Sequence, residues 1–191
     1  AILNDPYRGG THLPDITVVS PVVGPAGDIR FYVANRAHHA DVGGKSPGSL
    51  PLSTHIDDEG LRLAPQRWSD QVREQVAEAS RTPDERRGDL QAQIAANLRG
   101  RKRLVEHMER RGAEVWEAAE ELQTYSERFM RRMLREFPTG EWKFEDLMDD
   151  DGFGHQDLPI RCRVAIGDGE AAGDFTEAVG QTEGPSTAPR A

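Results

Sequence analysis

The sequence is poor in cysteine, in aromatic residues and in long apolar runs. A single cysteine among 191 residues excludes a disulfide framework and any zinc site built on clustered thiolates. No apolar run approaches the roughly 18 residues that a membrane-spanning helix needs, and the N-terminus lacks the basic and apolar regions of a secretory signal. We therefore expect a protein of a reducing compartment, the cytoplasm, with no membrane contact.

Basic residues are scarce relative to acidic ones. The chain has 24 Lys and Arg against 33 Asp and Glu, a formal net charge of −9. Proteins that bind nucleic acids draw much of their affinity from neutralised phosphates, so the charge argues against a nucleic-acid partner. The hydrophobic fraction of 36% is low for a self-contained globule. The chain opens on Ala1 rather than Met and closes on a proline-rich stretch, which predicts an internal piece of a longer protein.

Composition divides the chain into three regions. Residues 1–60 are rich in Gly, Pro and β-branched residues, residues 61–137 in Arg, Glu, Ala and Leu, and residues 138–191 in Asp and Gly. These compositions predict a β-hairpin region with His/Asp motifs, a mainly helical region, and a region of short strands with a loop tail. The expected fold class is α+β, as one partial domain of a larger subunit.

The middle region predicts an antiparallel helical hairpin. Thr82 and Pro83 carry the signals of a helix start, and Gly112 is typical of a C-terminal stop. A second helix with apolar residues every three or four positions is expected over residues 115–137. A weaker helix is expected over residues 69–80.

The remaining motifs indicate no separate chemistry. Alternation over residues 160–166 predicts a strand that turns Cys162 inward, as a small buried hydrophobe rather than a nucleophile or ligand. Residues 44–46, Gly-Lys-Ser, end like a phosphate-binding loop, but the required upstream glycine is absent. We therefore expect no ATP site on this chain.

Two short motifs near the N-terminus combine imidazole with carboxylate. The first contains His12 and Asp15, and the second contains His38, His39 and Asp41, each among glycines. Nitrogen ligands with hard oxygen ligands and no thiolate suit zinc, manganese or iron better than calcium or magnesium. Each motif alone is more often a solvated loop or a cap, so a metal site depends on the two meeting in space.

A β-hairpin would bring the two motifs together. Residues 16–23 and 29–35 have strand composition, and the turn composition between them predicts antiparallel pairing about a turn near Pro25. Such pairing places His12 roughly opposite His38 or His39, and Asp15 roughly opposite Arg36. Adjacent residues of a strand point to opposite faces, so only one of the two adjacent histidines faces the site.

The two motifs belong to a longer pattern that is typical of a known family. Its segments, in chain order, are residues 2–7, 9–15, 34–41, 47–49, 59–62, 81–83, 86–90, 92–97, 125–127, 150–152 and 174–176. Over nearly its whole length the chain resembles the B-type subunit of the hydantoinase/5-oxoprolinase family, which is related to the metal-carrying subunit of acetone carboxylases.

The resemblance implies ATP-dependent opening of a small cyclic amide, such as 5-oxoproline or a hydantoin, in a hetero-oligomer. An A-type partner subunit would bind ATP and phosphorylate the substrate, and this chain would complete the hydrolysis at a divalent metal, zinc or manganese. By the family pattern His12, Asp15 and His38 are metal ligands, with a further carboxylate expected upstream of Ala1. His39, Asp41 and Arg36 are the expected catalytic residues that orient ligands or substrate.

Two other interpretations stay open. The chain is, in the first, a truncated non-catalytic module that docks an A-type subunit through its helical region. In the second, it is a stand-alone metal hydrolase that needs no ATP.

Overall fold

The structure, a computed structural model, describes residues 1–24, 26–48 and 51–184. These residues form two compact units, Ala1–Arg110 and a second unit that begins at Arg111. The boundary falls inside the region 61–137, and the division of the chain into three regions stays a prediction. None of the described helices combines the length and the apolar composition needed to cross a membrane. The proline-rich end of the chain, residues 185–191, lies outside the described residues.

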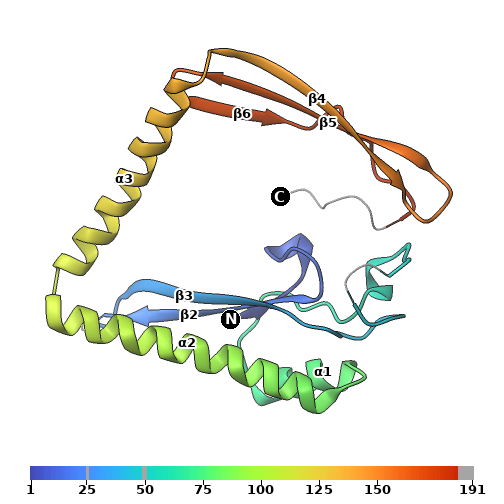
Figure 1. The fold of residues 1–191 in the computed structure, drawn as a ribbon. Coiled ribbons are helices and arrows are strands. Elements are labelled where there is room, and N and C mark those ends of the chain that lie inside the picture. Colours follow the sequence, from blue (N-terminus) through green and yellow to red (C-terminus); the bar gives the residue numbers. More distant parts are fainter. Residues whose placement is uncertain (25, 49–50, 185–191) are drawn as a thin grey trace. The chain divides into compact units, whose positions relative to one another are not determined.

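The first unit is built on a three-stranded antiparallel sheet (Figure 1). Its strands are β1 (Ile2–Leu3), β2 (Asp15–Val23) and β3 (Ile29–His38), in the order β1-β2-β3. The predicted hairpin of β2 and β3 is therefore confirmed, with β3 three residues longer than expected. Pro25, the residue near which the turn is predicted, lies outside the described residues.

The register of this hairpin differs from the expected one. Asp15 lies opposite His38, and Arg36 lies opposite Thr17, so the predicted facing of Asp15 and Arg36 is wrong. One residue of this difference comes from the register shift between Val22 and Val23, and the other comes from the pairing of Val23 with Ile29, which centres the hairpin on residue 26. A one-residue bulge of this kind changes the partner of every residue beyond it. As a consequence, two candidate metal ligands, Asp15 and His38, form a direct cross-strand pair.

The core of the first unit lies beneath β1 and β2. Alternate residues of β2 are buried, as expected for a strand with one face against a core. The buried polar residue Asn4 joins the surrounding loops, because its Nδ2 donates to the carbonyls of Leu13 and Leu61 and its Oδ1 accepts from the N–H of Leu63. The buried apolar core consists of Ile2, Leu13, Ile16, Val18, Val42, Leu63, Val72, Val76 and Leu90.

Two helices and two short 3₁₀ turns complete the first unit. The turns are Pro6–Arg8 and Ile56–Asp58, and the helices are α1 (Asp70–Ala79) and α2 (Pro83–Arg111). The Ser69 hydroxyl caps α1 by accepting from the N–H of Val72. Helix α2 begins at Pro83 and ends just before Gly112, as predicted.

The buried face of α2 is more polar than the sequence suggested. Leu90, Ile94 and Leu98 form an apolar stripe along α2 at four-residue spacing, but Leu98 is 57% exposed whereas Leu90 is fully buried. The positions that α2 buries are instead Arg86, Leu90, Gln93 and Asn97. Helix α2 therefore meets the sheet largely through polar side chains.

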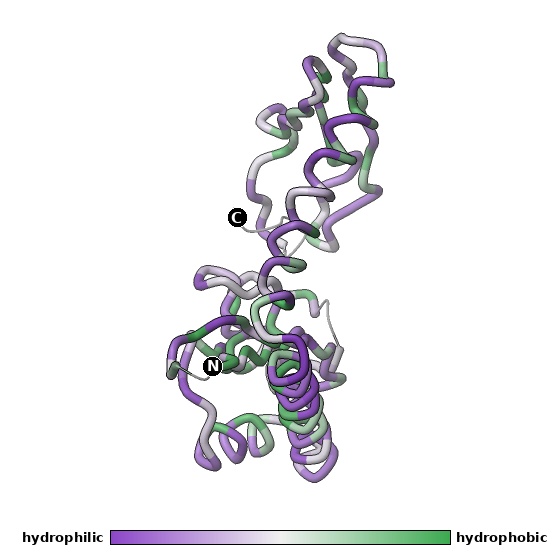
Figure 2. The backbone as a smooth tube through the Cα atoms, turned by 90° about the vertical axis from the view of Figure 1, so that its left-hand side faces the viewer, coloured by the Kyte–Doolittle hydropathy of each residue, from purple (hydrophilic) through white to green (hydrophobic). Residues whose placement is uncertain are grey.

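The second unit combines one helix with a second antiparallel sheet (Figure 1). Helix α3 (Glu114–Glu136) is followed by β4 (Gly140–Asp150), β5 (Gln156–Gly167) and β6 (Glu170–Asp174), in the order β4-β5-β6. Hydrophilic and hydrophobic residues alternate along α3 in Figure 2, the pattern of an amphipathic helix. The predicted strand over 160–166 is confirmed within β5, although Cys162 is only partly buried.

The α+β class is confirmed, and the antiparallel packing of the two long helices stays a prediction. Helix α2 belongs to the first unit and α3 belongs to the second. The strands that α3 contacts are β5 and β6. Within its own unit, α2 is hydrogen-bonded to β2 through Gln93 and Asn97.

Candidate metal centre

The loop before β2 positions the first two candidate ligands. The N–H of Asp15 donates to the carbonyl of His12 at 3.0 Å, which closes a turn with both side chains at the start of β2. Leu13 between them is fully buried and anchors this turn in the core. Gly10 packs so closely on the main chain that a Cβ atom would lie 2.2 Å from the carbonyl oxygen of Asn4. Position 10 therefore accepts glycine, which has no Cβ, on this path of the loop.

The cross-strand pair of β2 and β3 supplies the third candidate. The Nδ1 atom of His38 lies 2.9 Å from Oδ1 of Asp15, and Nε2 of His12 lies 3.1 Å from the same oxygen. The two imidazole rings have centroids 5.2 Å apart. One potential ligand atom from each of the three residues lies within 4.8 Å of the others. The structure thus brings His12, Asp15 and His38 together, as the hairpin argument predicted.

The charge state of Asp15 suits a metal ligand. Partial burial acts to raise the pKa of the Asp15 carboxyl, but hydrogen bonds and positive charge from His38 and His12 outweigh it. The pKa of Asp15 therefore lies below its ordinary value, and the carboxylate is ionised at neutral pH. The site is also open, since the His38 side chain is 50% exposed and that of His12 is 38% exposed.

The donor set fits a divalent transition metal. Two imidazoles and one carboxylate, with no thiolate, are a combination that holds zinc, manganese or iron. Three protein ligands on an exposed face leave positions for water or substrate, as catalytic rather than structural sites do. His12, Asp15 and His38 therefore fit the divalent metal that the sequence predicted.

Arg36 lies on the same face as this cluster. Its Nε donates to the hydroxyl of Thr17 at 2.9 Å, and its Nη1 donates to the hydroxyl of Thr11 at 3.3 Å. Thr11 in turn donates to Oδ2 of Asp15 at 3.5 Å. The guanidinium is therefore joined to the cluster through a single hydroxyl, although it does not face Asp15 across the strands.

His39 lies on the opposite face of β3 and is not brought into the cluster. Its side chain is 1% exposed, and its Nε2 donates to Oε1 of Gln93 at 3.0 Å. Burial lowers the pKa of His39, so the imidazole is neutral at physiological pH. The expectation that only one of the two adjacent histidines faces the site agrees with this placement.

Asp41 is also placed away from the cluster. Its carboxylate accepts hydrogen bonds from the backbone N–H groups of Arg81 and Gly43 and from the Arg81 guanidinium, at 2.7 to 3.0 Å. Burial alone would raise the pKa of Asp41, but these donors outweigh it and hold that pKa below its ordinary value. Asp41 thereby ties the loop after β3 to the segment between α1 and α2.

Sequence reasoning missed a set of buried amides between α2 and the sheet. Gln93 and Asn97, one helical turn apart, meet Asn35, which lies on the same face of β3 as His39. The four-residue spacing of two amides on α2 was the available signal, but the apolar stripe of the helix obscured it. These amides are 6% exposed at Gln93 and 3% exposed at Asn97.

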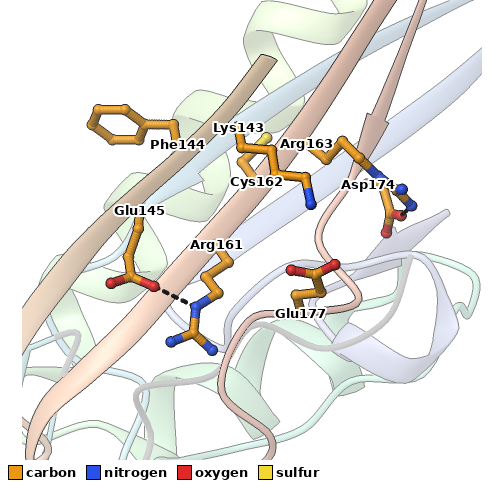
Figure 3. A pocket seen from close by; sticks show the side chains of 8 residues that line it. All are labelled: Lys143, Phe144, Glu145, Arg161, Cys162, Arg163, Asp174 and Glu177. Atoms are coloured by element: carbon orange, nitrogen blue, oxygen red, sulfur yellow. Dashed lines mark hydrogen bonds and ion pairs between the residues drawn. The ribbon is translucent and has the colours of Figure 1, made fainter. Parts of the chain in front are cut away.

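Two hollows accompany these features. One, of about 340 Å³, adjoins the cluster and is lined by Asn35, Ala37, His38, His39, Asp89, Ala92, Gln93 and Ala96. The other, of about 280 Å³, lies in the second unit (Figure 3) and is lined by Lys143, Phe144, Glu145, Arg161, Cys162, Arg163, Asp174 and Glu177. In the second hollow Arg161 pairs with Glu145, and Arg163 pairs with Asp174. Of these two hollows, the first is the one that adjoins a candidate metal ligand.

Comparison with known proteins places these features in a family. The whole chain, residues 1–191, matches the family model for hydantoinase B/oxoprolinase. The chain is 34% identical over 225 residues to 5-oxoprolinase 1 of Arabidopsis thaliana, covering 100% of this chain and 17% of that protein. It is 34% identical over 186 residues to the B-type subunit of a putative D-/L-hydantoinase from a Pseudomonas species, covering 91% of this chain and 31% of that protein.

A solved structure supports the same relationship. The crystal structure of an ATP-dependent caprolactamase from Pseudomonas jessenii superimposes with a TM-score of 0.78 and 30% sequence identity. The match covers 90% of this chain and 31% of that one. The chain thus spans less than a third of the length of each of these three proteins. Because the family model matches all 191 residues of this chain, the chain belongs to the hydantoinase B/oxoprolinase family.

Proposed function

We propose that this chain carries the divalent-metal site of an ATP-dependent hydrolase that opens small cyclic amides. The observation that carries the proposal is the convergence of His12, Asp15 and His38 at the end of the β2–β3 hairpin. It is supported by relatives named as a 5-oxoprolinase and as one component of a hydantoinase, and by a structural relative described as an ATP-dependent caprolactamase. The substrate class is therefore a ring such as 5-oxoproline, a hydantoin or a lactam.

The residues of the cluster would divide the work as follows. His12, Asp15 and His38 hold the ion, preferably zinc or manganese. A bound divalent ion supplies Lewis acidity or lowers the pKa of a water molecule. Arg36, held by Thr17 and joined to the cluster through Thr11, orients the negatively charged part of an activated substrate.

His39 and Asp41 act through position rather than by touching the substrate. His39 is buried against α2, and Asp41 is saturated by donors from the loop around Arg81. Both hold the segment that follows His38.

ATP would be bound by a partner subunit of the A type, which phosphorylates the carbonyl oxygen of the ring. The hydantoinase relative is named as a subunit, which supports an assembly of several chains. The absence of a complete phosphate-loop motif agrees with an ATP site elsewhere. A water molecule then adds to the activated ring carbon, the ring C–N bond breaks and inorganic phosphate leaves, so that the ring opens to a carboxylate and an amine. The assembly is a cytoplasmic hetero-oligomer in this proposal.

Metal content tests the proposal directly. In the full-length protein, His12→Ala should abolish stoichiometric binding of zinc or manganese, because it removes one of three protein ligands. His107→Ala is the matched control, since His107 is an exposed histidine on α2. Elemental analysis after dialysis would measure both variants. Stoichiometric metal retained by His12→Ala would refute the site.

The alternative, a non-catalytic module that docks an A-type subunit, is favoured by one observation. Leu122, Phe129 and Met133 of α3 are between 42% and 64% exposed. Co-purification with an A-type subunit, with no turnover of any cyclic amide when metal and ATP are supplied, would select this alternative.

A further inference from the structure

We infer that Gln93 is a positioning residue that holds Asp15 and His38 in register for metal binding, an inference that rests on the proposed metal site. Gln93 lies on α2, on the opposite side of the sheet from the candidate ligands. Its side chain is 6% exposed and touches both strands that carry those ligands.

The hydrogen bonds of Gln93 flank the candidate ligands in sequence. Its Nε2 donates at 2.9 Å to the carbonyl of Ile16, the residue after Asp15. Its Oε1 accepts at 3.0 Å from the ring of His39, the residue after His38. Asp15 and His38 are direct cross-strand partners. The Gln93 side chain is therefore hydrogen-bonded to both sides of the hairpin next to that pair.

The amide of Gln93 has no spare hydrogen-bonding capacity on its nitrogen. The second N–H of Nε2 donates at 2.8 Å to Oδ1 of Asn35. Asn35 uses its own amide N–H groups on the backbone carbonyl of Gln93 and on Oδ1 of Asn97. These bonds fix the orientation of each amide, so His39 must carry its proton on Nε2. An apolar side chain at position 93 would leave several buried groups unpaired.

Strand register matters here because the ligands come from different strands. Asp15 and His38 can share an ion only while their pairing is kept. Metal sites depend on the groups that orient their ligands, and loss of such support typically weakens affinity by roughly 10–100-fold. The backbone bond from the N–H of His39 to the carbonyl of Pro14, at 2.8 Å, closes the same end of the hairpin.

Asn97 provides a matched control. It is a buried amide one turn along α2, and its Nδ2 donates to the carbonyl of Val18 and to the hydroxyl of Ser20. It therefore joins α2 to β2 with the same kind of bonds as Gln93, and its Oδ1 accepts from Asn35 of β3, but its bonds to β2 lie farther from Asp15. A merely structural role for the buried amides predicts the same result at both positions.

The experiment compares Gln93→Leu with Asn97→Leu in the full-length protein. Cobalt(II) is titrated into metal-free protein, binding is followed by visible absorption and by competition with a chelator, and unfolding is measured on the same samples. We expect both variants to lose stability to a similar extent. Only Gln93→Leu should weaken cobalt affinity by roughly 10–100-fold and shift the absorption bands, because the geometry of the ligands changes.

The outcomes separate the inference from the site on which it rests. Equal cobalt affinity and equal spectra in the two variants would overturn the positioning role while leaving the metal site intact. Failure of the unmodified protein to bind cobalt would overturn the metal site and the positioning role together. Should Gln93→Leu not fold, Gln93→Met removes the same hydrogen bonds with an unbranched side chain of similar length.

Discussion

The two compact units of this chain differ in how well they bury their apolar residues. Among the described residues, the buried apolar side chains lie in the first unit, with Leu158 as the exception in the second. The second unit exposes many large apolar side chains, among them Leu122, Tyr125, Phe129, Met130, Met133, Phe137, Trp142, Phe144, Leu147, Ile160 and Phe175. Regular apolar spacing, which both units have, is therefore not sufficient to create a buried core.

The candidate metal site lies in the unit that has the buried core. The cluster of His12, Asp15 and His38 is mounted on the unit with the core, where buried residues of that core lie next to the ligands in sequence. The hollow of the second unit is lined by ion pairs between exposed side chains. Function that needs fixed geometry is expected where packing fixes the backbone.

The largest expected effect is a loss of stability that depends on which unit loses a leucine side chain. Leu90 is fully buried on α2, whereas Leu122 on α3 is 64% exposed. Leu90→Ala should lower the free energy of unfolding by about 2–5 kcal/mol, because it leaves a cavity. Leu122→Ala should change it by no more than about 0.5 kcal/mol. Urea denaturation of the full-length protein measures both.

A large effect at Leu122 would contradict this difference, because it would mean that the exposed face of α3 is packed in solution.

Metal binding should stabilise the first unit, which carries the candidate ligands, and not the second. At a free concentration of about 100 times the dissociation constant, zinc or manganese should add about 2.7 kcal/mol. Hydrogen exchange should slow at β2 and β3, around Asp15 and His38, and not in α3. A chelator should reverse the effect, and equal protection of both units would contradict a local site.

The smallest expected effect concerns pH. The folded state holds the pKa of Asp41 below its ordinary value, so the carboxylate stabilises the fold at neutral pH. That contribution should fall away as the pH drops from the ordinary value, about 4, toward the lower pKa of the folded state. Asp41→Asn should show a flatter loss of stability over this acid range, by on the order of 1 kcal/mol.

Urea midpoints at a series of pH values measure this slope. A variant that keeps the slope of the unmodified protein would show that other carboxyls control it.

Several features of the site could be predicted from the sequence because they depend on local signals. Turn composition over 24–28 between two strand-like runs was sufficient to predict that the motif of His12 and Asp15 meets the motif of His38 and His39, and the family resemblance selected His38. The helix start at Pro83 and the end before Gly112 follow from capping preferences. The exact cross-strand partners were not predictable, because the register shift between Val22 and Val23 has no signal in the sequence.

The amino-acid sequence was enough to predict the α+β class, the hairpin, the bounds of α2 and two His/Asp motifs with ligand chemistry suited to a metal. Each depends on neighbours along the chain, through backbone preference, alternation or ligand chemistry. Only the tertiary structure decided that Asp15 faces His38, that His39 turns toward Gln93, and that the two long helices serve different sheets. These depend on contacts between residues far apart in sequence, where the gain from filling a space or satisfying a buried group outweighs local preference.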